Sequence, residues 1–391
     1  MNHSTLLSAI RGQWDADIVP QLTDYIRIPA KSPHFDPQWE RHGHIERVIG
    51  LAHAWVKKQP LRGLAVEVIR LPGRTPLLYF DIAGSGDRTV LLYGHLDKQP
   101  EMTGWREGCG PWDPLYEDGK LYGRGSADDG YATFAALSAI GALQAQGIAH
   151  ARCAGMIETC EESGSYDLPA YLEALAPRLG NVDFVVGLDS GCGDYERLWA
   201  TTSLRGLTGG TLSVDVLTEG VHSGDASGIV PSSFRIARKL LDRIEDSATG
   251  RVLPPEFHAP IPEERARQAK AAAAIMGEST VRKYPFADRT APMIADYAEA
   301  LLNRTWRPAL SVTGADGFPA IADAGNVLRP RTLLPRRRRA CRLSNGSDGN
   351  GNGQPFNGKS TGSSNSEPHN TNTRLMTYGS GKKIFFIASS N

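Results

Sequence analysis

The chain has 391 residues, enough for two domains that each bury a hydrophobic core of their own. Its 43 Lys and Arg residues balance its 43 Asp and Glu residues, so no net charge favours nucleic acid or an anionic membrane as a partner. No segment approaches the run of about 20 apolar residues that a membrane-spanning helix requires, and we expect no membrane role.

The cysteines and the first residues predict a cytoplasmic protein. The five cysteines are odd in number and form no Cys-x-x-Cys pair, a pattern that favours reduced thiols over a disulfide framework. The opening residues, Met1 to Ser4, lack the basic and apolar regions of a secretory signal.

Residues 1–199 predict an α/β domain. Apolar residues at helical spacing predict a helix from Leu6 to Ile28, and the unbroken apolar run from Val90 to Tyr93 predicts a strand buried on both faces. Asp118-Gly119 predicts a hairpin turn, because this pair tolerates positive φ. Further helices are expected at 44–58, 130–146 and 168–176, and further strands at 65–69, 77–80, 153–157 and 182–188. This alternation indicates a doubly wound, mostly parallel sheet.

Residues 200–333 predict an α+β domain inserted after the first one. Thr211 to Val216 alternates polar and apolar residues, as a strand with one solvated face does. Pro231-Ser232-Ser233 begins an amphipathic helix, and Ala309 to Val312 is a further expected strand. The stripe expected on that helix is Phe234, Ala237, Leu241 and Ile244.

Residues 334–391 do not resemble a folded segment. A run of arginines, Arg336 to Arg339, is followed by Ser, Asn and Gly with almost no apolar residue before Leu375. Such a composition buries too little surface to offset the entropy of ordering, so we expect a disordered tail. Four arginines without aromatic residues between them would attract nucleic acid only weakly and without specificity.

Four groups of acidic residues or histidine follow the ends of apolar runs. They are His95 with Asp97, Asp128 with Asp129, Glu161 with Glu162, and Asp189. Each group alone has a simpler explanation: a turn histidine, a helix cap, a solvated charged turn, or an uninformative Asp. Together, at the carboxyl ends of strands in one α/β unit, they predict a metal site.

The residue types indicate which metal and which chemistry. Imidazole and carboxylate favour zinc, with manganese or cobalt as substitutes. Asp97 can accept the second ring proton of His95 and fix its tautomer. In the Glu161-Glu162 pair one carboxylate can bind metal while the other takes a proton from water. One carboxylate of Asp128-Asp129 can bridge two cations while the other caps the next helix.

Residues 22–330 resemble the co-catalytic di-zinc peptidase family that includes carnosinase-type dipeptidases, glutamate carboxypeptidase, aminoacylase and succinyl-diaminopimelate desuccinylase. The stretches that carry the resemblance are Tyr25 to Pro29, Tyr93 to Asp97, Leu121 to Gly130, Glu161 to Ser165, and Gly220 to Gly224. The forms Gly-His-Leu-Asp, Lys-Leu-Tyr-Gly-Arg-Gly and Glu-Glu-Ser-Gly-Ser are closest to the dipeptidase branch.

The resemblance implies a role for each matching residue. His95 and Asp189 would hold one zinc ion, Glu162 the other, and Asp128 would bridge the two, with a cis peptide bond at 128–129. Asp97 would orient His95, and Glu161 would be the general base. His222 would belong to a lid through which the chain forms a homodimer and would stabilise the oxyanion in the partner's site. Asn326 and Arg329 would contact the substrate carboxylate.

The resemblance stops before the last metal ligand. The family takes its final metal-binding histidine from a segment after the lid, and nothing here matches that segment; His369 lies in a polar tract. We interpret residues 334–391 as aberrant, as a change of reading frame would produce. Translating the neighbouring frames of the gene tests this interpretation.

The sequence therefore predicts a zinc-dependent hydrolase of dipeptides or short peptides with a free carboxylate, with two zinc ions per subunit. An N-acyl amino-acid amidohydrolase is the first alternative, because it uses the same metal chemistry. A relic without activity, lacking the last metal-binding histidine, is the second.

Overall fold

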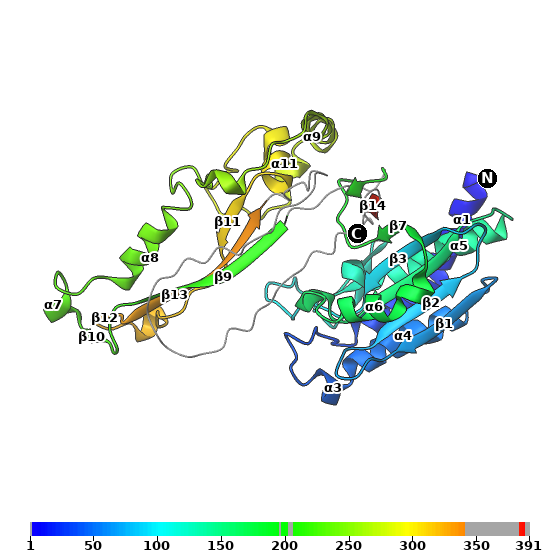
Figure 1. Cartoon of the computed structure of the whole chain (residues 1–391), viewed down its shortest axis with the longest axis horizontal. Coiled ribbons are helices and arrows are strands. Elements are labelled where there is room, and N and C mark those ends of the chain that lie inside the picture. Colours follow the sequence, from blue (N-terminus) through cyan, green and yellow to red (C-terminus); the bar gives the residue numbers. More distant parts are fainter. Residues whose placement is uncertain (1, 195–196, 202–205, 341–382, 388–391) are drawn as a thin grey trace. The chain divides into compact units, whose positions relative to one another are not determined.

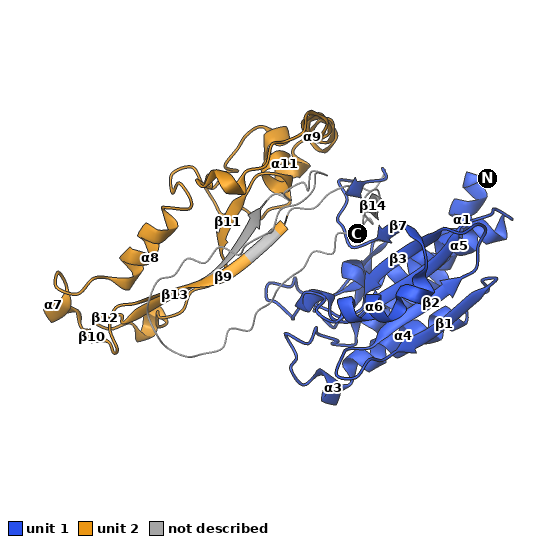
Figure 2. Cartoon of the chain, in the orientation of Figure 1, with its two compact units in different colours: residues 1–202, 364–391 blue, residues 203–363 orange. Residues whose placement is uncertain are grey.

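The computed structural model describes residues 2–194, 197–201, 206–340 and 383–387. The chain divides into two compact units, one of residues 1–202 with 364–391 and the other of residues 203–363 (Figures 1 and 2). Among the described residues, no helix combines the length and the apolar character that crossing a bilayer would demand.

The first unit is built on a seven-stranded sheet of order β1-β2-β6-β3-β7-β14-β8. Strand β3 pairs in parallel with β6 and with β7, and β7 pairs in parallel with β14. The pairs β1–β2, β2–β6 and β14–β8 are antiparallel, so only β2 and β8 oppose the direction of the other strands. The bounds are β1 Leu64–Ile69, β2 Leu77–Ile82, β3 Thr89–His95, β6 Arg152–Glu158, β7 Val182–Gly187, β8 Ala200–Thr201 and β14 Lys383–Ile387.

Helices cover both faces of this sheet, as a doubly wound fold requires (Figure 1). Alternate residues of β2 point to opposite faces. Phe80 packs into a core with residues of α2, α4 and α5, whereas Tyr79 packs with Tyr171 of α6. The helices are α1 His3–Gln13, α2 Val19–Ile26, α3 Trp39–His42, α4 His44–Lys57, α5 Ala132–Ala145 and α6 Leu168–Leu179, with a π-helical turn at Trp14–Ile18 between α1 and α2.

Short elements connect the sheet to these helices. Strands β4 (Leu115–Glu117) and β5 (Lys120–Tyr122) form the hairpin expected at Asp118-Gly119, where both residues have positive φ. Two helical turns, η2 (Ser126–Gly130) and η3 (Glu161–Ser163), follow β5 and β6. They carry two of the acidic groups that the sequence singled out.

The second unit is an α+β unit, as expected. Its three-stranded antiparallel sheet has the order β11-β13-β9, and α8 packs on it through Ala237, which is buried with Val214 and Leu334. Helix α8 ends at Leu241, so Ile244 lies outside the helix in which we expected it. The bounds are β9 Gly206–Asp215, β10 Val221–His222, α7 Ser223–Ala226, α8 Ser233–Leu241, η4 Pro255–Phe257, α9 Glu263–Met276, α10 Ser279–Arg282, α11 Tyr297–Thr305, β11 Ala309–Val312, η5 Ile321–Asp323, β12 Val327–Leu328 and β13 Arg331–Ala340.

The expectation of no structure after residue 333 is wrong for two segments. Strand β13 continues through the arginine run to Ala340, because β9 and β11 on either side satisfy its backbone groups whatever its side chains are. Strand β14 joins the sheet of the first unit, and its Ile384-Phe385-Phe386-Ile387 run is of the β-favouring type that we overlooked. Residues 341–382, His369 among them, lie outside the described residues.

Candidate metal centre

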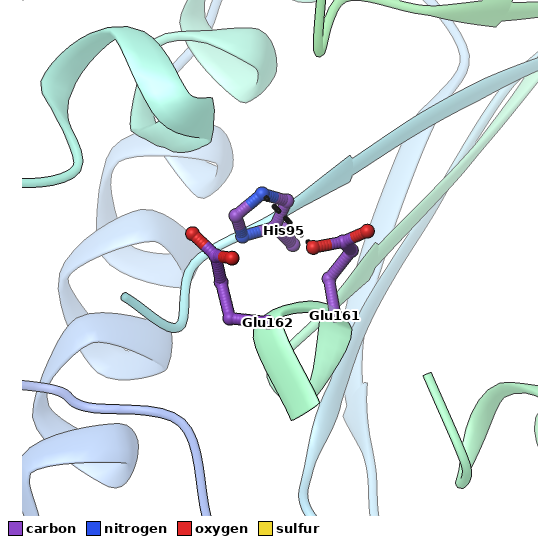
Figure 3. Close-up of side chains that lie close together, drawn as sticks. All are labelled: His95, Glu161 and Glu162. Carbon is purple, nitrogen blue, oxygen red and sulfur yellow. Dashed lines mark ion pairs between the residues drawn. The ribbon is translucent and has the colours of Figure 1, made fainter. Parts of the chain in front are cut away.

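The sheet topology brings the predicted residues to one edge. His95 ends β3, Glu161 and Glu162 lie in the turn after β6, and Asp189 follows β7. Because β6, β3 and β7 are neighbouring parallel strands, their carboxyl ends meet at the same edge. Figure 3 shows the side chains of Glu161 and Glu162 rising from their turn toward His95.

Carboxylate oxygens surround the Nε2 atom of His95. That nitrogen lies 3.4 Å from Asp128 Oδ1, 3.9 Å from Glu161 Oε2 and 3.9 Å from Asp189 Oδ2. It is buried and has no hydrogen-bond partner among the described residues. The other ring nitrogen, Nδ1, lies 3.0 Å from the backbone oxygen of Asp97, an acceptor that fixes the proton on Nδ1 and leaves the Nε2 lone pair free to bind a cation.

Asp97 links the histidine strand to the glutamate turn. Its fully buried carboxylate accepts hydrogen bonds from the backbone N–H groups of Glu161 at 3.1 Å and Glu162 at 3.0 Å. One of its oxygens also lies 3.5 Å from His95 Nδ1. The role predicted for Asp97 therefore extends beyond the histidine, because it also positions both glutamates.

Asp128 lies between two other carboxyl groups. The neighbouring imidazole of His95 is the main cause that lowers the pKa of Asp128, and the Asp128 carboxylate also interacts with Glu162 and with Asp189. The 128–129 peptide bond is cis, as the resemblance implied. The suggested capping role of the second carboxylate is wrong: α5 begins after Tyr131 without a side-chain cap, and Asp129 is fully buried beside His95.

Burial raises the pKa of several of these acids. It raises the pKa of Glu161 and that of Glu162 from 4.5 to about 7, and it raises the pKa of Asp189 as well. So many carboxylates around one imidazole repel one another when they are ionised, unless protons or cations lie between them.

The donor set fits divalent metal ions. Two groups each present three ligand atoms within 4.8 Å of one another: His95 with Glu161 and Glu162, and His95 with Asp128 and Asp189. Donors on a tetrahedral zinc ion with bonds of about 2.0–2.1 Å lie about 3.3 Å apart, close to the 3.4 Å between His95 Nε2 and Asp128 Oδ1. One oxygen of Glu162, Oε1, is also buried without a hydrogen-bond partner among the described residues.

The structure adds one side chain that sequence reasoning missed. The side-chain amide of Gln99 donates a short hydrogen bond to Oε2 of Glu162, which leaves Oε1 for a metal ion. Only its position in the sequence could have pointed to Gln99, because it lies two residues after Asp97, the last residue of the Gly94-to-Asp97 motif.

The three predicted residues of the second unit lie in or beside the strand pair β10–β12. His222 pairs with Val327. Asn326 comes directly before Val327, and Arg329 comes two residues after it. The backbone oxygen of Asn326 accepts a hydrogen bond of 2.9 Å from Ser223 N. His222 is exposed, and its Nδ1 accepts a hydrogen bond of 3.1 Å from Gly224 N.

Comparison with known proteins identifies similar sequences and folds. Residues 91–331 match the family described as peptidase family M20/M25/M40. The chain is 30% identical to the Beta-Ala-His dipeptidase of Homo sapiens over 262 residues, which are 64% of this chain and 48% of that protein. It is 27% identical to the Cysteinylglycine-S-conjugate dipeptidase of Corynebacterium striatum over 248 residues, 62% of this chain and 51% of that one. The chain therefore spans about half the length of these relatives.

A solved structure shares the fold. The crystal structure of human carnosine dipeptidase 1 matches 87% of this chain and 73% of its own chain, with a TM-score of 0.68 at 23% sequence identity.

Proposed function

Because this chain belongs to peptidase family M20/M25/M40, we propose that it is a metal-dependent hydrolase of dipeptides or short peptides with a free carboxylate. The observation that carries the proposal is the convergence of three carboxylates on the unpaired His95 Nε2, with Glu161 among them. The proposed hydrolysis of dipeptides agrees with the names of the two relatives described above, both of which are dipeptidases.

Two zinc ions would occupy this centre, with manganese or cobalt as substitutes. His95 and Asp189 would hold one ion, Glu162 would hold the other, and Asp128 would bridge them. When bound, such ions polarise the scissile carbonyl and make water more acidic. The interactions of Asp128 with both Glu162 and Asp189 support its bridging position.

Glu161 would act as the general base. In the metal-free chain burial raises the pKa of Glu161 to about 7, and a base works best when its pKa is close to the working pH. It would accept a proton from the attacking water and deliver it to the leaving amine. The Asp97 carboxylate accepts a hydrogen bond from Glu161 N and so fixes the backbone position from which the Glu161 side chain extends.

The second unit would supply substrate contacts. His222 would stabilise the oxyanion in the site of a partner subunit, and Asn326 and Arg329 would bind the substrate carboxylate. This proposal requires a homodimer formed through residues 200–333. Cys109, Cys153, Cys160 and Cys192 are free thiols, which fits a cytoplasmic enzyme.

A panel of substrates and a metal analysis test the proposal. The zinc-loaded chain is assayed against β-Ala-His and Cys-Gly, and against N-acetyl and N-succinyl amino acids. Release of free amino acids from the dipeptides supports a dipeptidase, and turnover of the acylated amino acids alone supports the amidohydrolase. A chain that binds zinc at neither position and cleaves nothing would be the inactive relic.

A further inference from the structure

Lys98 is a fully buried lysine that the proposed mechanism does not use. It follows Asp97 in the loop after β3, and its exposed fraction is 0%. A buried amine is costly unless its hydrogen bonds are satisfied. Its position beside the candidate metal centre therefore requires an explanation.

The amine of Lys98 binds the end of helix α2. Its Nζ donates hydrogen bonds to the backbone oxygens of Tyr25 at 2.7 Å and Ile28 at 2.8 Å, with Ile26 O further away at 3.4 Å. The last carbonyls of a helix have no partner within the helix, so they are natural acceptors for such a group. Burial lowers the pKa of Lys98 to about 6, and a neutral amine still has the two N–H donors that the two short bonds need. The lysine thus ties the loop after β3 to α2 in either charge state.

Lys98 and Tyr25 pack against opposite ends of η2, the turn that carries Asp128. A Cβ atom on Gly125 would lie 2.8 Å from Cγ of Lys98, so the lysine stem packs against the start of η2. A Cβ atom on Gly130 would lie 2.3 Å from the Tyr25 ring, which therefore packs against the end of η2. The Nζ atom of Lys98 lies 3.8 Å from the centre of that ring.

Tyr25 also reaches the histidine loop. Its fully buried side chain donates a hydrogen bond of 3.0 Å from the phenol oxygen to the backbone oxygen of Leu96, between His95 and Asp97. One buried pair therefore contacts the two loops that carry the predicted ligands His95 and Asp128, although neither side chain is a metal ligand.

We propose that Lys98 and Tyr25 are positioning residues that set the separation of His95 and Asp128 and so determine the affinity for the metal ion that these ligands share. This inference rests on the metal site of the proposed function. The lysine fixes the loop after β3 against α2, and its stem and the tyrosine ring fix η2 against that loop.

Zinc titration of the full chain tests this proposal. Lys98→Met keeps most of the aliphatic stem but removes the hydrogen bonds from Nζ to Tyr25 O and Ile28 O. Tyr25→Phe keeps the ring but removes the hydrogen bond to Leu96 O. The matched control is Tyr171→Phe, which removes buried hydrogen bonds to Thr75 O at 2.6 Å and from Leu71 N at 3.2 Å on the other face of the sheet. Zinc affinity is measured by calorimetry or chelator competition at a temperature where each variant is folded.

Lys98→Met is expected to weaken zinc binding about 10- to 100-fold, as loss of a residue that supports metal ligands typically does. Tyr25→Phe should weaken it less, and Tyr171→Phe should lower thermal stability while leaving zinc affinity unchanged. Wild-type zinc affinity in Lys98→Met overturns the inference. If Lys98→Met does not fold, wild-type affinity in Tyr25→Phe overturns it equally. A wild-type chain that binds no zinc overturns the proposed metal site as well, and a chain that binds zinc but cleaves no peptide leaves the inference standing.

Discussion

Asp97→Asn tests whether the Asp97 carboxylate positions the two glutamates for metal binding. In the native chain the Asp97 carboxylate accepts two backbone hydrogen bonds, from Glu161 N at 3.1 Å and from Glu162 N at 3.0 Å. The asparagine oxygen can accept only one of these bonds, and its NH₂ group then faces the other N–H donor. The substitution keeps the size of the side chain, so the effect comes from hydrogen bonding and charge.

The size of the effect follows from these contacts. A buried hydrogen bond to a charged group contributes about 1.5–3 kcal/mol, and an unsatisfied buried donor costs about 1–3 kcal/mol. We therefore expect the free energy of unfolding of the metal-free first unit to fall by about 2–3 kcal/mol. Zinc affinity should fall by about 10- to 100-fold, because one of the two glutamate N–H groups loses its acceptor and the carboxylate charge 3.5 Å from His95 Nδ1 is removed.

Denaturant unfolding and zinc titration measure the two effects. Asp167→Asn is the control, since Asp167 is also buried and its carboxylate accepts hydrogen bonds from Thr75 N at 2.9 Å and Arg74 Nη1 at 2.8 Å, neither of which is a predicted ligand. It should cost similar stability and leave zinc affinity unchanged. Equal losses of zinc affinity in the two variants, or none in Asp97→Asn, would refute the reasoning.

Three further predictions concern the centre itself. Glu161→Gln should lower kcat by about 10²- to 10⁴-fold with zinc content retained, and loss of zinc by elemental analysis would remove its assignment as the base. Asp128→Ala should lose both zinc ions in the same analysis, because a bridge serves each; retention of one tightly bound ion would argue against bridging. In the metal-free chain the pKa of Glu161 and that of Glu162 are raised by burial from 4.5 to about 7, so the folded state binds more protons than the unfolded state between these values. Its stability should therefore fall as pH rises from about 4.5 through 7, as followed by thermal unfolding in chelator, and Glu162→Gln should flatten that slope.

Local sequence patterns identified most elements of the first unit and the side chains that the structure brings together beside His95. The apolar run before His95 predicted a buried strand, which the structure has as β3 ending at His95, and the Asp118-Gly119 pair predicted the hairpin correctly. The group Glu161-Glu162 was predicted to follow a strand, and η3 begins three residues after β6 ends. Each of these signals lies within a few residues, where periodicity and turn chemistry act.

The contacts that organise the centre depend on residues far apart in the chain. Asp97 meets the backbone of Glu161 across 64 positions, and Lys98 meets Tyr25 O across 73. No period in the sequence encodes such pairs, because they form only when β6 is placed beside β3 and α2 is packed under the loop that follows it. The strand at 383–387 shows the same limit, since its apolar run became informative only once β7 and β8 provided an edge to pair with.

The sequence by itself thus singled out the side chains that could bind a cation, because strand ends and acidic pairs are local features. Only the tertiary structure decided which of them converge on His95 Nε2 and which hold the others in place, because that distinction depends on distances between segments that the order of residues does not specify.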